Sequence, residues 1–169
     1  MFTIRAARPD ELETVWALVR RAVAHMNAMG NPQWGEDYPA KSDYAGDLSA
    51  GELYAAMDET GRLLGVACIN GRESPEYAGV AWEYHGPVLS VHRLAVDPEV
   101  QRQGVATALV AHAEALAQSQ GRKALHVDTY AQNDRMQALF RKRGYEQRGD
   151  ISLHGRPLRF PCFEKLLME

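Results

Sequence analysis

The stretch VHRLAVDPEVQRQGVATAL, residues 91–109, decides the fold of this chain. The apolar run Val88–Val96 predicts a strand, and Asp97-Pro98 predicts the turn that ends it. An alanine-rich helix follows Gly104, where the missing Cβ allows a ligand to approach the backbone closely. The first N–H groups of a helix lack intrahelical partners and lie at the positive end of its dipole. The turn therefore predicts an anion site, and because no Lys-Ser/Thr pair follows the glycine, it is not an NTPase phosphate loop.

A family resemblance rests on two joined patterns. Residues 101–106 read Gln-x-x-Gly-x-Ala, and the preceding strand reads Arg-Leu-Ala-Val-Asp-Pro. Together they resemble the acetyl-CoA pyrophosphate loop of the GCN5-related N-acetyltransferase (GNAT) superfamily. The six-residue pattern alone is permissive, and the strand before it and the helix after it make it specific. The alternative is an ordinary strand–turn–helix unit with a packing glycine.

Length and charge place the chain among ordinary globular proteins. Its 169 residues predict a single domain, residues 1–169, with a core that needs neither disulfides nor metal. Nineteen basic and 22 acidic residues leave a formal charge of −3. A nonspecific nucleic-acid binder needs excess Lys and Arg to neutralise phosphates, so we expect no nucleic-acid partner.

The composition also bears on compartment and metal content. Cys68 and Cys162 lie in apolar runs and are expected to be small buried hydrophobic residues. The N-terminal sequence lacks an apolar core of signal-peptide length, and no run approaches the roughly 18 apolar residues of a membrane span. The six histidines show no metal-ligand spacing. We therefore expect a cytoplasmic protein with no membrane association and no metal.

Periodicity and turn residues predict the elements of the first half. Apolar residues between Leu12 and Met26 recur at spacings of three and four, which indicates one buried helix face. Glycines and a proline between residues 30 and 35 end that helix. The predicted elements are a strand at Phe2–Arg5, a helix after Pro9, a short helix at Lys41–Leu48 and a hairpin of Leu53–Met57 with Leu63–Asn70.

The second half predicts two further helices and three strands. The strand–helix–strand order around Gly104 predicts parallel neighbouring strands. With the resemblance, the order implies an α/β (α+β) GNAT fold with a central mixed, largely antiparallel twisted sheet of about six to seven strands and about four flanking helices. The predicted elements are a helix ending at Gly121, a strand at Ala124–Thr129, a helix from Asn133 to Gly144, and strands at Tyr145–Arg148 and Phe160–Leu166 paired across turns at Gly149 and His154-Gly155.

The resemblance implies acetyl-CoA as cosubstrate. Backbone N–H groups from Arg102 to Thr107 would hold its pyrophosphate, and the strand Leu94–Val96 would pair with its pantetheine arm. Asn133 opens a second family motif, Asn-x-x-x-x-Ala-Leu-Phe-x-x-x-Gly-Tyr, and would contact the cofactor or cap a helix. The implied cofactor-binding residues are Leu94, Ala95, Val96, Gln101, Arg102, Gln103, Gly104, Val105, Ala106, Thr107, Asn133 and Phe140.

The second motif departs from the family at one catalytic position. It often reads Leu-Tyr, and that tyrosine protonates the leaving thiolate, whereas this chain has Leu139-Phe140. Either the reaction proceeds without this acid, which a thiol-like pKa near 8.5 tolerates, or another group substitutes. Tyr130 is the nearest candidate by sequence, with packing at a strand end as its alternative role.

The reaction implied is acetyl transfer to a primary amine, which needs a proton acceptor. A lysine-like amine has a pKa of about 10.4, so on the order of one in a thousand is neutral near pH 7. His92 is the first candidate base because alternation along the strand places it on the face of Leu94, and its alternative role is a packed strand histidine. Glu83 is the second candidate, and Asp128, polar on an apolar strand, could orient the amine.

Four aromatic residues outside the predicted core are candidate acceptor contacts. Aromatic faces suit a cationic amine, although they equally suit a cap over a helix or a dimer contact. Gln33-Trp34 and Tyr38-Pro39 resemble the acceptor-side segment of a bacterial GNAT subgroup of uncharacterised substrate. The predicted substrate-binding residues are Trp34, Tyr38, Trp82, Tyr84 and Asp128.

Three functional hypotheses follow. The first is an acetyl-CoA-dependent N-acetyltransferase, a monomer or homodimer, acting on a small-molecule or peptide amine. The second, suggested by Phe140, is a noncatalytic acyl-CoA-binding module of the same fold. The third, a nucleotide-binding regulator, is weaker because the extra glycines and acidic ribose partner of a dinucleotide fingerprint are missing.

Overall fold

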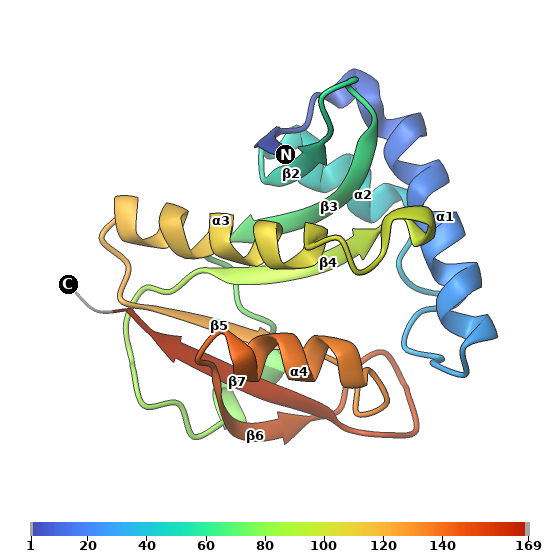
Figure 1. The fold of residues 1–169 in the computed structure, drawn as a ribbon. Helices are drawn as coiled ribbons and strands as arrows, with labels where there is room; N and C mark the ends of the chain where they lie inside the picture. The colour runs from blue at the N-terminus through green and yellow to red at the C-terminus, as the bar shows by residue number, and fades with distance from the viewer. Residues whose placement is uncertain (1, 168–169) are drawn as a thin grey trace. The chain divides into compact units, whose positions relative to one another are not determined.

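The computed structural model describes residues 2–167 (Figure 1). Contact clustering divides the chain into two compact units. The first unit runs to Ile69 and resumes from His92 to His112, and the second comprises Asn70–Val91 and the chain from Ala113 onward. Among residues 2–167, no helix is both long and apolar enough to cross a membrane.

Residues 2–167 form seven strands, four α-helices and three short 3₁₀ segments, η1–η3. Their number and order confirm the GNAT-type arrangement expected from the sequence. In chain order they are β1 (Thr3–Ala6), η1 (Pro9–Glu11), α1 (Leu12–Ala28), α2 (Lys41–Ser49), β2 (Leu53–Met57), β3 (Leu63–Asn70), η2 (Pro75–Gly79), β4 (Ser90–Val96), η3 (Pro98–Val100), α3 (Val105–Ser119), β5 (Ala124–Asp128), α4 (Asp134–Lys142), β6 (Glu146–Ile151) and β7 (Phe160–Leu166).

The first unit is built on a four-stranded sheet in the order β1-β2-β3-β4. Strand β2 pairs antiparallel with both β1 and β3, so that Leu53 lies opposite Cys68. Helices α1 and α2 supply the facing apolar side chains, as the helical spacing predicted. The buried core residues of this unit include Val15, Leu18, Val19, Tyr44, Leu48, Leu53, Val66 and Cys68.

Close packing against β3 positions the start of α3. A Cβ added to Gly65 would lie 2.9 Å from Val105 Cγ1 and 3.0 Å from the Ala95 carbonyl oxygen. Only glycine allows the helix and the neighbouring strand to approach β3 this closely. The first turn of α3 is therefore fixed directly over the sheet, with Val105 and Leu109 buried beneath it.

The second unit is built on a three-stranded antiparallel sheet in the order β5-β7-β6, with α4 lying along it (Figure 1). The Phe140 ring of α4 lies 5.5 Å from the ring of Phe163 and 5.3 Å from that of Tyr145. The predicted parallel pairing is present as one bridge, between Leu89 and Leu125. The seven strands thus form two hydrogen-bonded sheets of four and three strands.

One sequence prediction in this unit is wrong. Gly149 was expected to mark a turn, but it lies inside β6, where the pairing with β7 shifts register. A Cβ there would lie 3.4 Å from Val80 Cγ1, an ordinary van der Waals distance, so Gly149 marks a bulge in the strand pairing rather than a chain reversal. Strand β6 consequently extends to Ile151, beyond the predicted end at Arg148.

Candidate active site

The turn after β4 is held by a buried carboxylate. Asp97, 1% exposed, accepts a hydrogen bond from the Glu99 N–H at 3.0 Å and pairs with Arg21 at 3.0 Å and Arg62 at 3.1 Å. Burial by itself would raise the pKa of Asp97, but these donors outweigh it and hold the pKa below its ordinary value. Asp97 thus fixes the direction in which the chain leaves the strand and enters the loop.

The loop from Gln101 to Gly104 leads into the first turn of α3 through two left-handed residues. Arg102 (φ 67°) and Gly104 (φ 86°) are left-handed, whereas Gln101 is extended (φ −64°, ψ 153°). The Ala108 N–H donates to the Gly104 carbonyl at 2.9 Å. The N–H groups of Val105, Ala106 and Thr107 precede this bond, and within residues 2–167 none of the three has a protein acceptor.

Strand β4 carries a local departure from regular geometry next to the candidate base. Arg93 has φ 50°, outside the extended region, and its carbonyl accepts a hydrogen bond from the Tyr44 hydroxyl at 3.1 Å. Regular alternation of side chains therefore does not continue across Arg93. Alternation no longer places His92 on the same face of the strand as Leu94 and Val96. All three side chains are half-buried, and the role of His92 stays a prediction.

The Arg93 side chain joins the segment that carries Tyr38 to this strand. Its guanidinium contacts buried Asp47 through two hydrogen bonds, at 2.8 Å and 2.6 Å, and donates to the Tyr38 hydroxyl at 3.2 Å. Burial would lower the pKa of Arg93, but the Asp47 carboxylate raises it above its ordinary value. Tyr38 is therefore oriented by an ion pair, whereas Trp34 is 6% exposed and packs in the core of the first unit.

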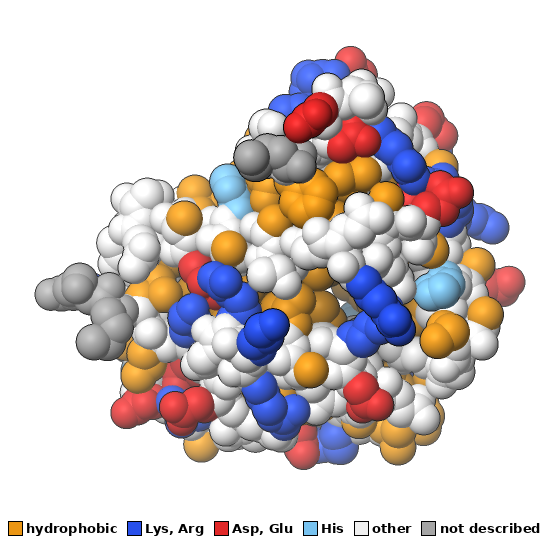
Figure 2. Space-filling model, viewed as in Figure 1, with side chains coloured by type: hydrophobic (Ala, Val, Ile, Leu, Met, Phe, Trp, Pro, Cys, Tyr) orange, Lys and Arg blue, Asp and Glu red, His pale blue; other side chains and the backbone are white. Residues whose placement is uncertain are grey.

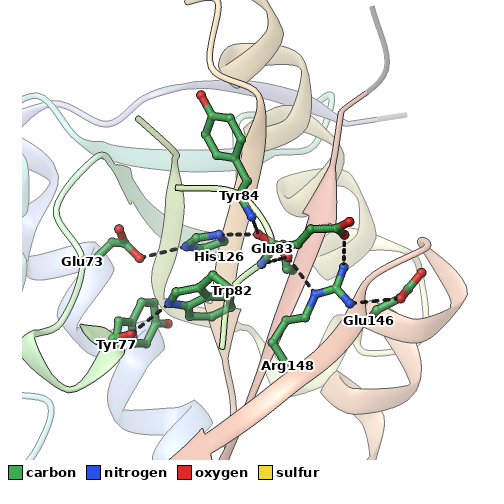
Figure 3. A network of polar contacts seen from close by, with 9 residues as sticks. Glu73, Tyr77, Trp82, Glu83, Tyr84, His126, Glu146 and Arg148 are labelled. Carbon is green, nitrogen blue, oxygen red and sulfur yellow. Dashed lines mark hydrogen bonds and ion pairs between the residues drawn. The ribbon is translucent and has the colours of Figure 1, made fainter. Parts of the chain in front are cut away.

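A second polar cluster surrounds Glu164 in the second unit (Figure 3). Its carboxylate is buried and accepts from the backbone N–H groups of Glu83 and Tyr84, both at 3.0 Å. Arg148 Nε donates to it at 2.7 Å, and His126 Nε2 lies 2.8 Å away. Four groups from a loop and two strands converge on one carboxylate. Burial would raise the pKa of Glu164, but these groups hold it below its ordinary value.

His126 links the other members of this cluster. Its Nδ1 lies 2.9 Å from Glu73 Oε2, and its ring stacks on Trp82 at 3.8 Å between centroids and 7° between planes. Carboxylates only accept hydrogen bonds, so whichever His126 nitrogen carries a proton finds a carboxylate acceptor in Glu73 or Glu164. Trp82 also donates its Nε1–H to the Tyr77 carbonyl at 2.9 Å.

The loop held by Glu164 carries three of the predicted site residues. Trp82 is 8% exposed, so most of its ring is used in packing. Glu83 is exposed and pairs with Arg148 Nη2 at 2.9 Å, and Tyr84 is half-buried. The structure therefore brings the three onto one anchored segment, with Glu83 already engaged by a cation.

Two further candidates lie at the end of β5 and just after it. Asp128 Oδ2 accepts a hydrogen bond from the Tyr77 hydroxyl at 2.5 Å, and desolvation raises the pKa of Asp128 to about 6. Tyr130 is fully buried against Phe160, with ring centroids 4.9 Å apart. Its hydroxyl oxygen accepts the Leu158 N–H at 3.1 Å, which leaves the phenolic proton available to another acceptor.

The second motif begins with a helix cap. The Asn133 Oδ1 accepts the Met136 N–H at 3.1 Å, which confirms the N-cap role considered from sequence. Phe140 is 2% exposed and packs between Phe163 and Tyr145. Cofactor contacts of Asn133 and Phe140 stay predictions. Among the described residues, no group of three or more His, Cys, Asp or Glu side chains could hold a metal ion.

Comparison with known proteins identifies the family. A family model described as "Acetyltransferase (GNAT) family" matches residues 17–145, more than half of the chain. The chain belongs to the GNAT family. A comparison of this GNAT chain with curated protein sequences gave no match.

Solved structures of GNAT acetyltransferases share the fold over nearly their whole length. A GNAT acetyltransferase from Streptococcus agalactiae has a TM-score of 0.87 at 24% identity, covering 99% of this chain and 96% of the other. PaiA N-acetyltransferase from Thermoplasma acidophilum, solved with coenzyme A, has a TM-score of 0.74 at 15% identity, covering 99% of both chains. YncA, a putative acetyltransferase from Salmonella typhimurium solved with acetyl-CoA, has a TM-score of 0.71 at 17% identity, covering 99% and 95%.

Sequence reasoning missed the network around Glu164 in this GNAT protein. A signal was present, because His126 and Glu164 are polar residues within the buried strands β5 and β7. They lie directly opposite each other in the antiparallel register, which makes them a cross-strand pair. Sequence alone does not fix that register, so the pairing emerged only from the structure.

Proposed function

We propose that this GNAT protein transfers the acetyl group of acetyl-CoA to a primary amine of a small molecule or peptide. The observation that carries the proposal is the loop before α3. Left-handed Arg102 and Gly104 and the N–H groups at the start of α3 offer several donors on one short segment. A pyrophosphate needs such a concave set of donors at the positive end of a helix dipole.

The chemistry requires three further contributions from the chain. A backbone N–H near Val96 would stabilise the tetrahedral oxyanion, and one such donor contributes about 10²–10³ in rate in other enzymes. His92 and Glu83 are the sequence candidates for the base, although Glu83 is ion-paired with Arg148. Tyr130 is the sequence candidate for the acid, although its side chain is fully buried and its oxygen accepts the Leu158 N–H. Reaction without an acid remains the alternative, since a thiol-like pKa near 8.5 makes the thiolate a tolerable leaving group.

A noncatalytic acyl-CoA-binding module is the second candidate function. The observation that favours it is Phe140, which stands where the family often has a tyrosine and is buried between two aromatic rings. A phenyl ring donates no proton. Both candidates require acetyl-CoA binding, and only the first requires an acetylated product.

Calorimetric titration with acetyl-CoA tests the loop. The wild type should bind in the micromolar range, and Gly104→Ala should bind at least tenfold more weakly because its φ of 86° disfavours an L side chain. Gly61→Ala is a matched control, because Gly61 has φ 85° and open space in a hairpin turn. Binding lost equally in both variants would indicate general strain, and no binding by the wild type would overturn the proposal.

A further inference from the structure

Asp128 lies in an environment unlike that of the other buried aspartates. It ends strand β5 opposite Cys162, and its Oδ2 accepts a hydrogen bond from the Tyr77 hydroxyl at 2.5 Å. Tyr77 is 2% exposed, so this hydroxyl is held in place. Asp128 is half-buried as a residue. Its carboxylate is thus held at one oxygen by a buried hydroxyl.

No cation within residues 2–167 neutralises this carboxylate. Buried Asp47 pairs with an arginine at 2.6 Å and buried Asp97 pairs with two, whereas Asp128 has no ion pair. The groups that face it are the Tyr77 hydroxyl, the Glu76 carboxylate and the Cys162 thiol. None of them carries positive charge. A desolvated carboxylate without a counter-ion is costly, and such groups occur preferentially at functional sites.

The missing partner is a cation with hydrogen-bond donors. We propose that Asp128, oriented by Tyr77, binds the ammonium group of the acceptor and takes its proton, which rests on the amine acetyltransferase function proposed above. An aliphatic ammonium supplies both the charge and the N–H donors that this carboxylate lacks. Buried Tyr77, Trp82, Tyr130 and Phe160 form an aromatic cluster in this unit, and a low-dielectric surrounding strengthens the charge pair.

The proton transfer balances as follows. One N–H bond of the ammonium breaks and its proton passes to the free oxygen of Asp128, leaving a neutral amine. The amine lone pair forms the C–N bond to the acetyl carbonyl carbon, and the C–S bond breaks with its electron pair on sulfur. A second N–H bond then breaks on the acetylated nitrogen, its proton passes to the thiolate, and Asp128 releases the first proton to water. The sum is R–NH₃⁺ plus acetyl-CoA giving the N-acetylated amine, CoA thiol and one proton.

Carboxyl ¹³C NMR of the aspartate-labelled protein tests the binding step without turnover. Asp128, assigned by the resonance that Asp128→Asn removes, should titrate near pH 6 because desolvation raises its pKa to about 6. Saturating n-butylammonium should lower that midpoint by 0.5 unit or more, on the order of a single exposed charge pair, because a bound cation favours the carboxylate. n-Butanol, the uncharged probe of similar size, should not move it. A midpoint unaffected by n-butylammonium would overturn the proposal.

Steady-state kinetics tests the proton transfer. Asp128→Asn should lower kcat/KM for the amine by about 10²–10⁴, the usual contribution of a general base, and leave acetyl-CoA binding within about twofold. The acidic limb of the kcat/KM profile should disappear in Asp128→Asn. Tyr77→Phe should move it to higher pH, because the Tyr77 hydrogen bond lowers the pKa of Asp128. A limb that instead disappears only in His92→Gln would overturn the assignment.

Controls separate this inference from the proposed function. Asp150→Asn is a matched variant, because Asp150 is exposed on β6 and pairs with Arg159 at the surface. It should leave the rate and the pH profile unchanged. If the wild type acetylates no amine, the proposed function fails, while the n-butylammonium titration still decides for or against the cation site. If the wild type acetylates the amine, and Asp128→Asn has the same kcat/KM and pH profile as Asp150→Asn, only the inference about Asp128 fails.

Discussion

Replacing Glu164 with glutamine tests whether the cluster in Figure 3 anchors the loop that carries Glu83 and Tyr84. The Glu164 side chain is fully buried and accepts hydrogen bonds from the backbone N–H groups of Glu83 and Tyr84. Its carboxylate also contacts the side chains of Arg148 and His126. Glutamine offers one oxygen and turns an NH₂ toward the remaining donors. Each buried donor left without an acceptor costs about 1–3 kcal/mol, so two such donors cost about 2–6 kcal/mol. At about 2–4 °C per kcal/mol for a chain of this length, Tm should fall by about 4–24 °C.

A matched variant makes this measurement specific. Glu146 also contacts Arg148, at 3.3 Å, but its side chain is 73% exposed. Glu146→Gln should change the free energy of unfolding by less than about 0.5 kcal/mol, because exposed ion pairs contribute little. Urea and thermal unfolding followed by circular dichroism would report both variants. Equal stability of Glu164→Gln and Glu146→Gln would show that the buried carboxylate does not anchor the loop.

The same variant carries a pH dependence with a definite sign. The pKa of folded Glu164 is lowered, so its stabilising contribution is present above the unfolded pKa and is lost as pH falls through the folded value. The stability difference between wild type and Glu164→Gln should therefore shrink below about pH 4.5. A difference that stays constant from pH 7 to pH 3 would show that shape, rather than charge, determines the cost.

Three further predictions concern stability. Arg5 lowers the pKa of Glu11 to about 2, so Glu11→Gln should cost about 1–3 kcal/mol at pH 7, with the difference vanishing between about pH 4.5 and pH 2 in acid unfolding curves. The raised pKa of Asp128 means that the folded protein binds the Asp128 proton more tightly than the unfolded chain does. Asp128→Asn should therefore stabilise the protein at pH 8 by about 1–3 kcal/mol and have little effect at pH 3.5. Destabilisation at pH 8 would contradict this. Phe140→Ala should cost about 3–5 kcal/mol in urea unfolding by leaving a cavity beside Phe163, whereas a loss below 1 kcal/mol would show that the site collapses.

The fold was largely predictable because local signals agreed with one another. The predicted strand at Phe160–Leu166 and the predicted hairpin strands at Leu53–Met57 and Leu63–Asn70 have the observed bounds. In each, β-branched or aromatic residues are bounded by turn residues. The turn predicted at Gly149 was wrong because a glycine in a bulge and a glycine in a turn look alike in sequence. The pairing of β6 with β7, with its register shift, distinguishes them.

The site was predictable only where one segment carries it. The loop at Gly104 is local, so its left-handed glycine and the helix start could be anticipated. The clusters around Glu164 and Arg93 depend on strand register and on contacts between distant segments, which sequence does not specify. The left-handed conformation of Arg93 is likewise invisible in sequence, because arginine has no preference for it.

Charge patterning at the surface agrees with the composition. Figure 2 shows basic and acidic side chains on the same face, with hydrophobic side chains among them. A field of one sign would be expected for a protein that holds nucleic-acid phosphates along an extended surface. The mixed surface agrees with the small net charge of −3. The proposed function therefore rests on local sites rather than on a surface of one charge.

The most direct test of the account is a transfer reaction with ¹³C-labelled acetyl-CoA and a panel of primary amines, read by mass spectrometry of the amine and by release of CoA thiol. The account predicts a labelled acetyl amide formed in equal amount to the thiol. It predicts the product at least tenfold slower in Gly104→Ala and at the wild-type rate in Gly61→Ala, which shares its backbone conformation. Acetyl-CoA binding without any labelled amide would contradict the acetyltransferase and leave the noncatalytic acyl-CoA-binding module.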